Sequence, residues 1–187
     1  MTTTPAEQDV TEVLTQDHRE FLSLVDEIRA TSDPERRREL ADTMIAEIVR
    51  HAVAEEMHVY PAMEEHLPDG ERAVAHDKQE HNELEQTMKE LEGTDAASPR
   101  FLELVDSMEA QLRDHISDEE GEQFPVLRQR VPRDQLLDMA RKVETAKRIA
   151  PTRPHPSAPN ERPFHLVAGP GVGMVDRLRD TLSGRDV

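Results

Sequence analysis

The chain has 187 residues, of which 34% are charged and 35% are hydrophobic, and its formal net charge is −17. This acidic balance argues against nucleic acid as a partner, because a phosphate backbone would be repelled. The absence of cysteine excludes disulfides, thiolate metal sites and cysteine nucleophiles. With one tyrosine, four phenylalanines and no tryptophan, the chain lacks the aromatics of a base-stacking platform. Nine histidines, by contrast, are many for an acidic chain of this length.

The first residues are polar, and no apolar run approaches the length of a membrane span or a signal peptide. We therefore expect a cytoplasmic protein with no membrane partner. The periodicity of apolar residues predicts helices throughout residues 1–149, separated by short turns. The expected helices are 9–30, 34–67, 71–92, 99–130 and 132–149.

Local signals support these boundaries. Asp9 and Glu12 form a capping box at the start of the first helix, and Thr4 with Glu7 offers a competing, earlier one. Pro61 should kink the second helix, and Pro125 should break the fourth. Four long helices joined by short turns predict an all-α fold, an antiparallel up-down-up-down four-helix bundle with one extra short helix.

The end of the chain has a different composition. Residues 150–187 are rich in proline, and we expect them to form a tail outside a bundle domain of residues 1–149. The stretch 150–163 resembles an extended, polyproline-like linker. Residues 172–182 place apolar side chains on one side of a short amphipathic helix.

The chain also repeats itself. Residues 16–21 (QDHREF) resemble residues 79–84 (QEHNEL), at an offset of 63 positions. Residues 51–63 resemble residues 115–127, at an offset of 64 positions, and both contain His-x-x-x-Glu-Glu followed by an aromatic residue and proline. Two such similar offsets indicate that the second helical hairpin is a diverged copy of the first.

Six polar residues of these repeats occupy positions where the helical period requires a core residue. They are His18, His51, Glu55, His81, His115 and Glu119. Burying them without partners would cost on the order of 1–3 kcal/mol each, and more for a carboxylate. Two cations would resolve this cost, and imidazole with carboxylate suits iron, zinc, manganese or copper. A single buried histidine is usually a hydrogen-bonded core residue, but two matching sets favour a dinuclear metal site within residues 10–127.

This pattern resembles the hemerythrin-like family, also called the HHE cation-binding domain, and in particular its bacterial hemerythrin-like members. The resemblance implies two iron ions joined by an oxo or hydroxo bridge. It assigns His18 and His51 to one iron and His81 and His115 to the other, with Glu55 and Glu119 bridging. On this ligand set, two octahedral positions remain open.

Two further residues, His76 and Tyr60, are candidate ligands of such a centre. His76 lies five residues before His81, about 140° around the helix, so a surface position is favoured over ligation. Tyr60 takes the place of Phe124 in the other repeat, and some members of this family use a phenolate ligand. A straight helix would point Tyr60 away from His51, whereas a kink at Pro61 would turn it inward.

The acidic residues Glu56 and Glu120 repeat as well. Contact with a ligand imidazole is one interpretation, and a solvated helix face is the other.

The resemblance implies a protein that binds or reacts with small oxidants: oxygen, hydrogen peroxide or nitric oxide. Detoxification of peroxide or nitric oxide, with catalase- or peroxidase-like activity, is one alternative. Reversible oxygen binding, and a sensor or iron-handling module without turnover, are the others. A ferritin-like oxidase needs two inward Glu-x-x-His motifs, and only Glu55-x-x-His58 qualifies. Neither the physiological ligand nor a protein partner follows from the spacing.

Overall fold

The computed structural model describes residues 8–155, together with Val172, Asp176, Asp180, Thr181 and Val187. Its helices are α1 (Val10–Ala30), α2 (Pro34–His58), α3 (Tyr60–His66), α4 (Gly70–Gly93), α5 (Pro99–Asp118), the π-helical turn η1 (Glu119–Gln123), α6 (Phe124–Arg130) and α7 (Arg133–Ile149). No strand occurs among these residues. The predicted all-α class is therefore confirmed.

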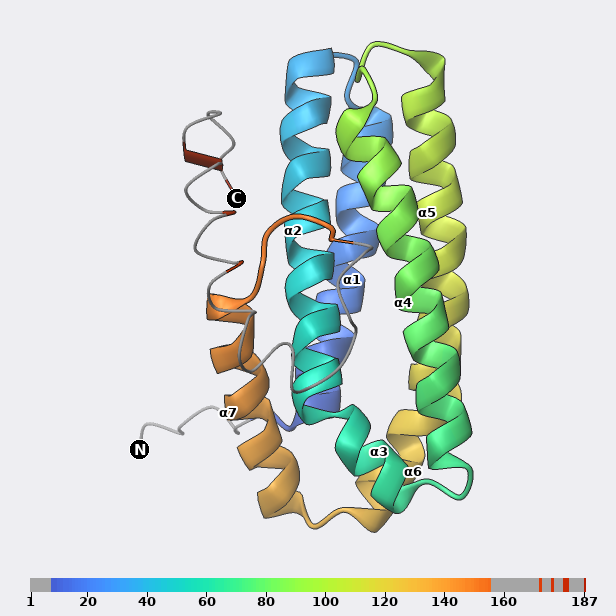
Figure 1. Cartoon of the computed structure of the whole chain (residues 1–187), viewed down its shortest axis with the longest axis vertical. Helices are drawn as coiled ribbons and strands as arrows, with labels where there is room; N and C mark the ends of the chain where they lie inside the picture. The colour runs from blue at the N-terminus through green and yellow to red at the C-terminus, as the bar shows by residue number, and fades with distance from the viewer. Residues whose placement is uncertain (1–7, 156–171, 173–175, 177–179, 182–186) are drawn as a thin grey trace, which may run out of the picture.

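Figure 1 shows α1, α2, α4 and α5 as four long helices lying alongside one another. The short helices α3 and α6 meet at one end of this bundle, and α7 packs on its outside against α1 and α2. None of the described helices has the length and apolar character needed to cross a lipid bilayer.

The helix starts follow the expected capping chemistry. Asp9 accepts hydrogen bonds from the backbone N–H groups of Thr11 and Glu12, and the Glu12 carboxylate accepts one from the Asp9 N–H. The competing capping box of Thr4 and Glu7 lies outside the described residues. Asp33 caps α2, and its Pro34 occupies the first turn, where a missing N–H costs nothing.

Each half of the sequence contains a proline in a long helical segment, but the backbone before that proline differs between the two halves. In the first half of the sequence, α2 ends at His58 and α3 begins at Tyr60, so the helix is interrupted just before Pro61. In the second half, the helix continues through the π-helical turn Glu119–Gln123 before Pro125. A π-helical turn holds one extra residue, which shifts the register of the side chains that follow it.

Apolar side chains form two clusters, one toward each end of the bundle. Leu14 belongs to the cluster at the α3, α6 and α7 end, and Phe21 to the cluster at the opposite end. Full burial of each such side chain contributes about 1.5–3 kcal/mol to folding. His18 lies between these two residues on α1, so the polar side chains form a layer between two apolar clusters.

The described part of the C-terminal region touches the bundle. Arg153 forms an ion pair with Glu92 of α4, and the His155 N–H donates to Glu85 of the same helix. In the expected helix 172–182, Val172, Asp176, Asp180 and Thr181 are helical. Its other residues, and residues 156–171, lie outside the described part of the chain.

Candidate metal centre

The six polar residues expected at the core lie together in the middle of the bundle. Each is buried, with at most 4% of its surface exposed. Their donor atoms form two groups, within each of which all atoms lie within 4.8 Å of one another. The first group contains His18, His51, Glu55 and Glu119, and the second contains Glu55, His81 and His115.

Within each donor group, the two imidazoles approach one another through their Nε2 atoms. His18 Nε2 lies 3.3 Å from His51 Nε2, and His81 Nε2 lies 3.3 Å from His115 Nε2. Two nitrogens that bind one ion at about 2.1 Å, with an angle between the octahedral and tetrahedral values, stand roughly 3.0–3.4 Å apart. The spacing within each half therefore fits a shared cation.

The two glutamates lie between the halves. Glu55 places Oε1 at 3.1 Å from His51 Nε2 and Oε2 at 3.5 Å from His81 Nε2. Glu119 Oε2 lies 3.2 Å from His18 Nε2 and 3.6 Å from His115 Nε2. Each carboxylate thus faces one imidazole of each half, as a carboxylate bridging two ions would.

The same two carboxylates also carry the strongest sign that the site fits a cation. Apart from these approaches to the imidazoles, the oxygens of Glu55 and Glu119 have no hydrogen-bond partner in the described part of the chain, although both side chains are wholly buried. A buried carboxylate without a donor is costly, and native structures contain few of them. Divalent or trivalent ions between the carboxylates and imidazoles would satisfy all four oxygens.

A second set of carboxylates holds the outer side of each imidazole, where the Nδ1–H donates to a carboxylate oxygen. The four pairs are His51 with Asp17 at 3.0 Å, His18 with Glu120 at 2.8 Å, His81 with Glu56 at 3.2 Å and His115 with Glu80 at 2.9 Å. Such bonds fix the ring orientation and leave Nε2 free to bind a metal. All four pairs obey the internal repeat.

Glu56 and Glu120 thus contact imidazoles, which decides between the two interpretations that the sequence left open. Asp17 and Glu80 were not anticipated. The signal for them was the acid that directly precedes His18 and His81 in both copies. Asp17 is held in turn by Lys147 of α7, since Lys147 Nζ lies 2.7 Å from Asp17 Oδ1. Helix α7 therefore takes part in orienting His51.

We expect Glu120→Ala to weaken metal binding by about 10- to 100-fold, because His18 would lose the acceptor that orients it. The Glu120 side chain is 35% exposed, so its removal should leave the fold intact. Titration with a chelator competing for the metal measures the change. Glu65→Ala, at an exposed position of α3, is the control, and equal affinity in both variants would contradict the assigned role of Glu120.

Without metal, the neighbouring carboxylates favour the protonated forms of His51, His81 and His115. Burial alone would lower the pKa of His51, but the carboxylates of Glu55 and Asp17 outweigh it and raise the pKa to about 10. The pKa values of His81 and His115 are raised against burial in the same way. Burial would raise the pKa of Glu55, whereas His51 and His81 hold it well below its usual range. Metal binding must therefore displace protons.

Tyr60 lies beside His81, next to the donor group of Glu55, His81 and His115. The helix break before Pro61 turns its side chain toward His81, and its hydroxyl lies 3.2 Å from His81 Nε2. The two rings are stacked, with centroids 5.7 Å apart. On the other side of the centre, Phe124 stacks on His18 with centroids 6.1 Å apart. Burial and nearby carboxylates, Glu55 foremost, raise the pKa of Tyr60 well above its usual value.

His76 lies outside both buried groups. Its side chain is 55% exposed, and its Nε2 lies 3.5 Å from Glu80 Oε1 and 3.6 Å from Asp118 Oδ2. The residue of α4 that does face inward, one turn before His81, is Asp77, which is fully buried. Its Oδ1 accepts a hydrogen bond from Gln123 at 3.0 Å, and its Oδ2 has no partner. The repeated histidines give no sign of Asp77, although its position four residues before His81 places it on the same face of the helix.

The fold and the paired donor groups define a helical-bundle protein with a cation-binding core. Residues 9–127 match the family model described as the hemerythrin HHE cation binding domain. The chain is 30% identical over 174 residues to an uncharacterised hemerythrin-like protein of Schizosaccharomyces pombe, which covers 92% of this chain and 86% of the relative. This chain therefore belongs to the hemerythrin HHE cation-binding family.

A second relative is a DNA nickase from Nostoc sp., 23% identical over 141 residues. The match spans 75% of this chain but only 40% of the nickase. No solved structure matches the chain.

Proposed function

We propose that this protein holds two iron ions and reacts with small oxidants: oxygen, hydrogen peroxide or nitric oxide. His18 and His51 would bind one ion, His81 and His115 the other, and Glu55 and Glu119 would span both. The observation that carries the proposal is the pair of buried donor groups joined through Glu55, whose carboxylate has no other partner. A pair of iron ions would supply one electron from each ion, and together these make the two electrons that reduction of peroxide, or of oxygen to the peroxide level, requires.

The chain's own residues restrict this chemistry to small molecules. The centre lies in a buried layer between two apolar clusters, and each ligand imidazole is fixed by an outer carboxylate. Only small molecules reach a site of this kind without opening the bundle. We do not extend DNA nicking to this chain, because a net charge of −17 repels phosphate backbones.

The proposal is tested by metal analysis of freshly purified protein, combined with visible spectra. We expect two irons per chain. Rapid loss of added peroxide with persistent colour indicates detoxification, and a reversible change after anaerobic reduction and oxygen addition indicates a carrier. Protein that contains only zinc and ignores both oxidants contradicts the proposal.

Tyr60 is proposed as an additional ligand on the His81 side. A phenolate favours Fe(III), so it would disfavour the diferrous state from which reversible oxygen carriage starts. We expect Tyr60→Phe to lose a visible phenolate-to-iron charge-transfer band while iron content stays at two per chain. Phe124→Tyr, at the matching place in the other repeat, serves as the comparison. A spectrum unchanged in Tyr60→Phe would show that Tyr60 is only a core aromatic.

A sensor role is the second candidate, favoured by the contacts of the C-terminal region. The His155 N–H donates to Glu85, one helical turn after the proposed ligand His81. A change in α4 caused by metal binding would then alter the contacts of residues 150–155. Hydrogen–deuterium exchange of metal-free and iron-loaded protein tests this, and equal exchange of the His155 N–H in both forms would remove this candidate.

A further inference from the structure

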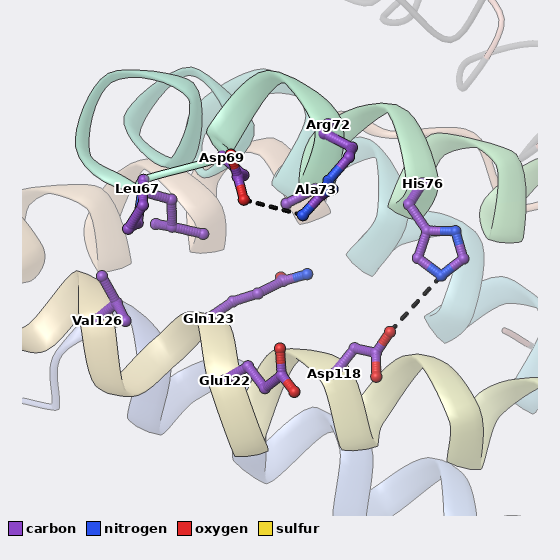
Figure 2. A pocket seen from close by; sticks show the side chains of 10 residues that line it. Leu67, Asp69, Arg72, Ala73, His76, Asp118, Glu122, Gln123 and Val126 are labelled. Atoms are coloured by element: carbon purple, nitrogen blue, oxygen red, sulfur yellow. Dashed lines mark hydrogen bonds and ion pairs between the residues drawn. The ribbon is translucent and has the colours of Figure 1, made fainter.

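A pocket of about 540 Å³ opens beside the proposed centre. It is lined by the first turns of α4, by the turn before them, and by the segment from α5 through η1 to α6. Figure 2 shows the side chains around it, with Gln123 pointing into the space and His76 directed across it toward Asp118. Nothing in the function proposed above uses this pocket.

Two residues that line the pocket, His76 and Asp118, form a possible metal-binding group with the adjacent Glu80. His76, Glu80 and Asp118 offer donor atoms that all lie within 4.8 Å of one another. His76 Nε2 lies 3.5 Å from Glu80 Oε1 and 3.6 Å from Asp118 Oδ2. One imidazole and two carboxylates are a donor set suited to a divalent cation.

The charge of the pocket also favours a cation. Arg72 is the only arginine or lysine among its lining residues, and it is paired with Asp69 at 2.9 Å. The acidic side chains of Asp118 and Glu122 complete the lining on the opposite wall. A concave surface with an excess of one charge raises the local concentration of the opposite ion.

This donor group is connected to the buried centre through Glu80. Its Oε1 faces His76, while its Oε2 accepts a hydrogen bond from Nδ1 of His115 at 2.9 Å. Glu80 and His115 form a further donor group with the buried Asp77. His115 also belongs to the group that contains Glu55 and His81. Three donor groups, each sharing a residue with the next, thus lead from solvent to the centre.

Asp77 and Gln123 supply an independent sign of this route. Gln123 lines the pocket and also donates to Asp77 Oδ1 at 3.0 Å. The other oxygen of Asp77 is fully buried and has no partner, and the Oε1 of Gln123 has none either. Unpartnered oxygens between a pocket and a metal centre are suited to a cation in passage.

We propose that this pocket is the route by which divalent metal reaches the centre, with His76, Glu80 and Asp118 as the capturing site and Asp77 as the inner relay. The inference rests on the proposed function, because it supposes that the centre takes up metal. It assigns His76 a role in metal uptake and not in the centre itself.

The test measures the rate of metal uptake by metal-free protein, with Co(II) as the probe and its visible absorption followed by stopped flow. We expect Asp118→Asn to lower the second-order rate constant by about tenfold, because attraction by charge contributes at least this factor. His76→Ala should also lower it, because the variant removes the imidazole donor of the capturing site. The final content should remain two ions per chain. His66→Ala, a histidine of α3 outside the pocket, is the control and should take up Co(II) at the wild-type rate.

A steric pair of variants tests the same route without altering charge. Ala73 lines the pocket, whereas Ala75, two residues further along α4, is exposed and does not. We expect Ala73→Phe to slow uptake and Ala75→Phe to leave it unchanged. The route is overturned if all variants load at the wild-type rate, or if His76→Ala lowers the final content. Wild-type protein that binds no Co(II) would instead overturn the proposed function and, with it, this route.

Discussion

Replacing Glu55 by glutamine should abolish the joint binding of two ions. Glu55 is the residue shared by both donor groups, and an amide oxygen offers neither the charge nor the second donor atom of a carboxylate. We expect metal affinity to fall more than about 100-fold, beyond the range found when only outer partners are removed. Metal analysis after dialysis against a weak chelator should give fewer than two ions per chain.

Glu64→Gln, an exposed substitution on α3 of the same chemical type, provides the matched control. It should retain two ions under the same dialysis. Circular dichroism of both variants separates loss of metal from loss of the helical fold. A Glu55→Gln protein that is folded and still binds two ions as tightly as the wild type would contradict the central role assigned to this carboxylate.

Metal should also stabilise the fold strongly. Free metal at about 1,000 times its dissociation constant contributes about 4 kcal/mol of stability. For a domain of 150–250 residues this corresponds to a rise in melting temperature of roughly 8–16 °C. Thermal unfolding with and without a chelator measures the effect, and a melting temperature indifferent to metal would contradict the proposed centre.

This stabilisation should grow as the pH rises from about 6.5 to 8.5. The pKa of His51 in the folded, metal-free protein is about 10, above its usual value of about 6.5. Its contribution to metal-free stability is therefore complete below pH 6.5 and is lost as the pH rises through 10. Metal competes with the same protons, so it binds better as they leave. A metal-induced shift that shrinks over this range would contradict the argument.

The bundle and the six central residues could be predicted from the sequence because both depend on helical period alone. A polar residue at a core position is visible without knowledge of the neighbouring helix. The outer carboxylates are different. Asp17 orients His51 and Glu80 orients His115, so each acts on a helix other than its own. Only the packing of the helices reveals such pairs.

Two further positions depended on local distortions of the helices. An ideal helix directs Tyr60 away from the centre, and the break at Val59 reverses that direction. Gln123 reaches Asp77 from the π-helical turn, which periodic patterns do not anticipate. His76 is exposed, as its five-residue spacing from His81 favoured, and the carboxylate of Asp77 occupies the inward position one turn before His81.

The difference between Tyr60 and Phe124 makes the two copies of the hairpin unequal partners. Tyr60, in the first copy, places a hydroxyl beside His81 of the second copy, whereas Phe124, in the second copy, places a bare hydrocarbon ring beside His18 of the first. If the phenol takes one of the two open coordination positions, the other would lie near Phe124, whose ring offers no proton and no hydrogen bond. After the duplication, this asymmetry would let one side of the centre hold a protein ligand and the other side bind small uncharged molecules.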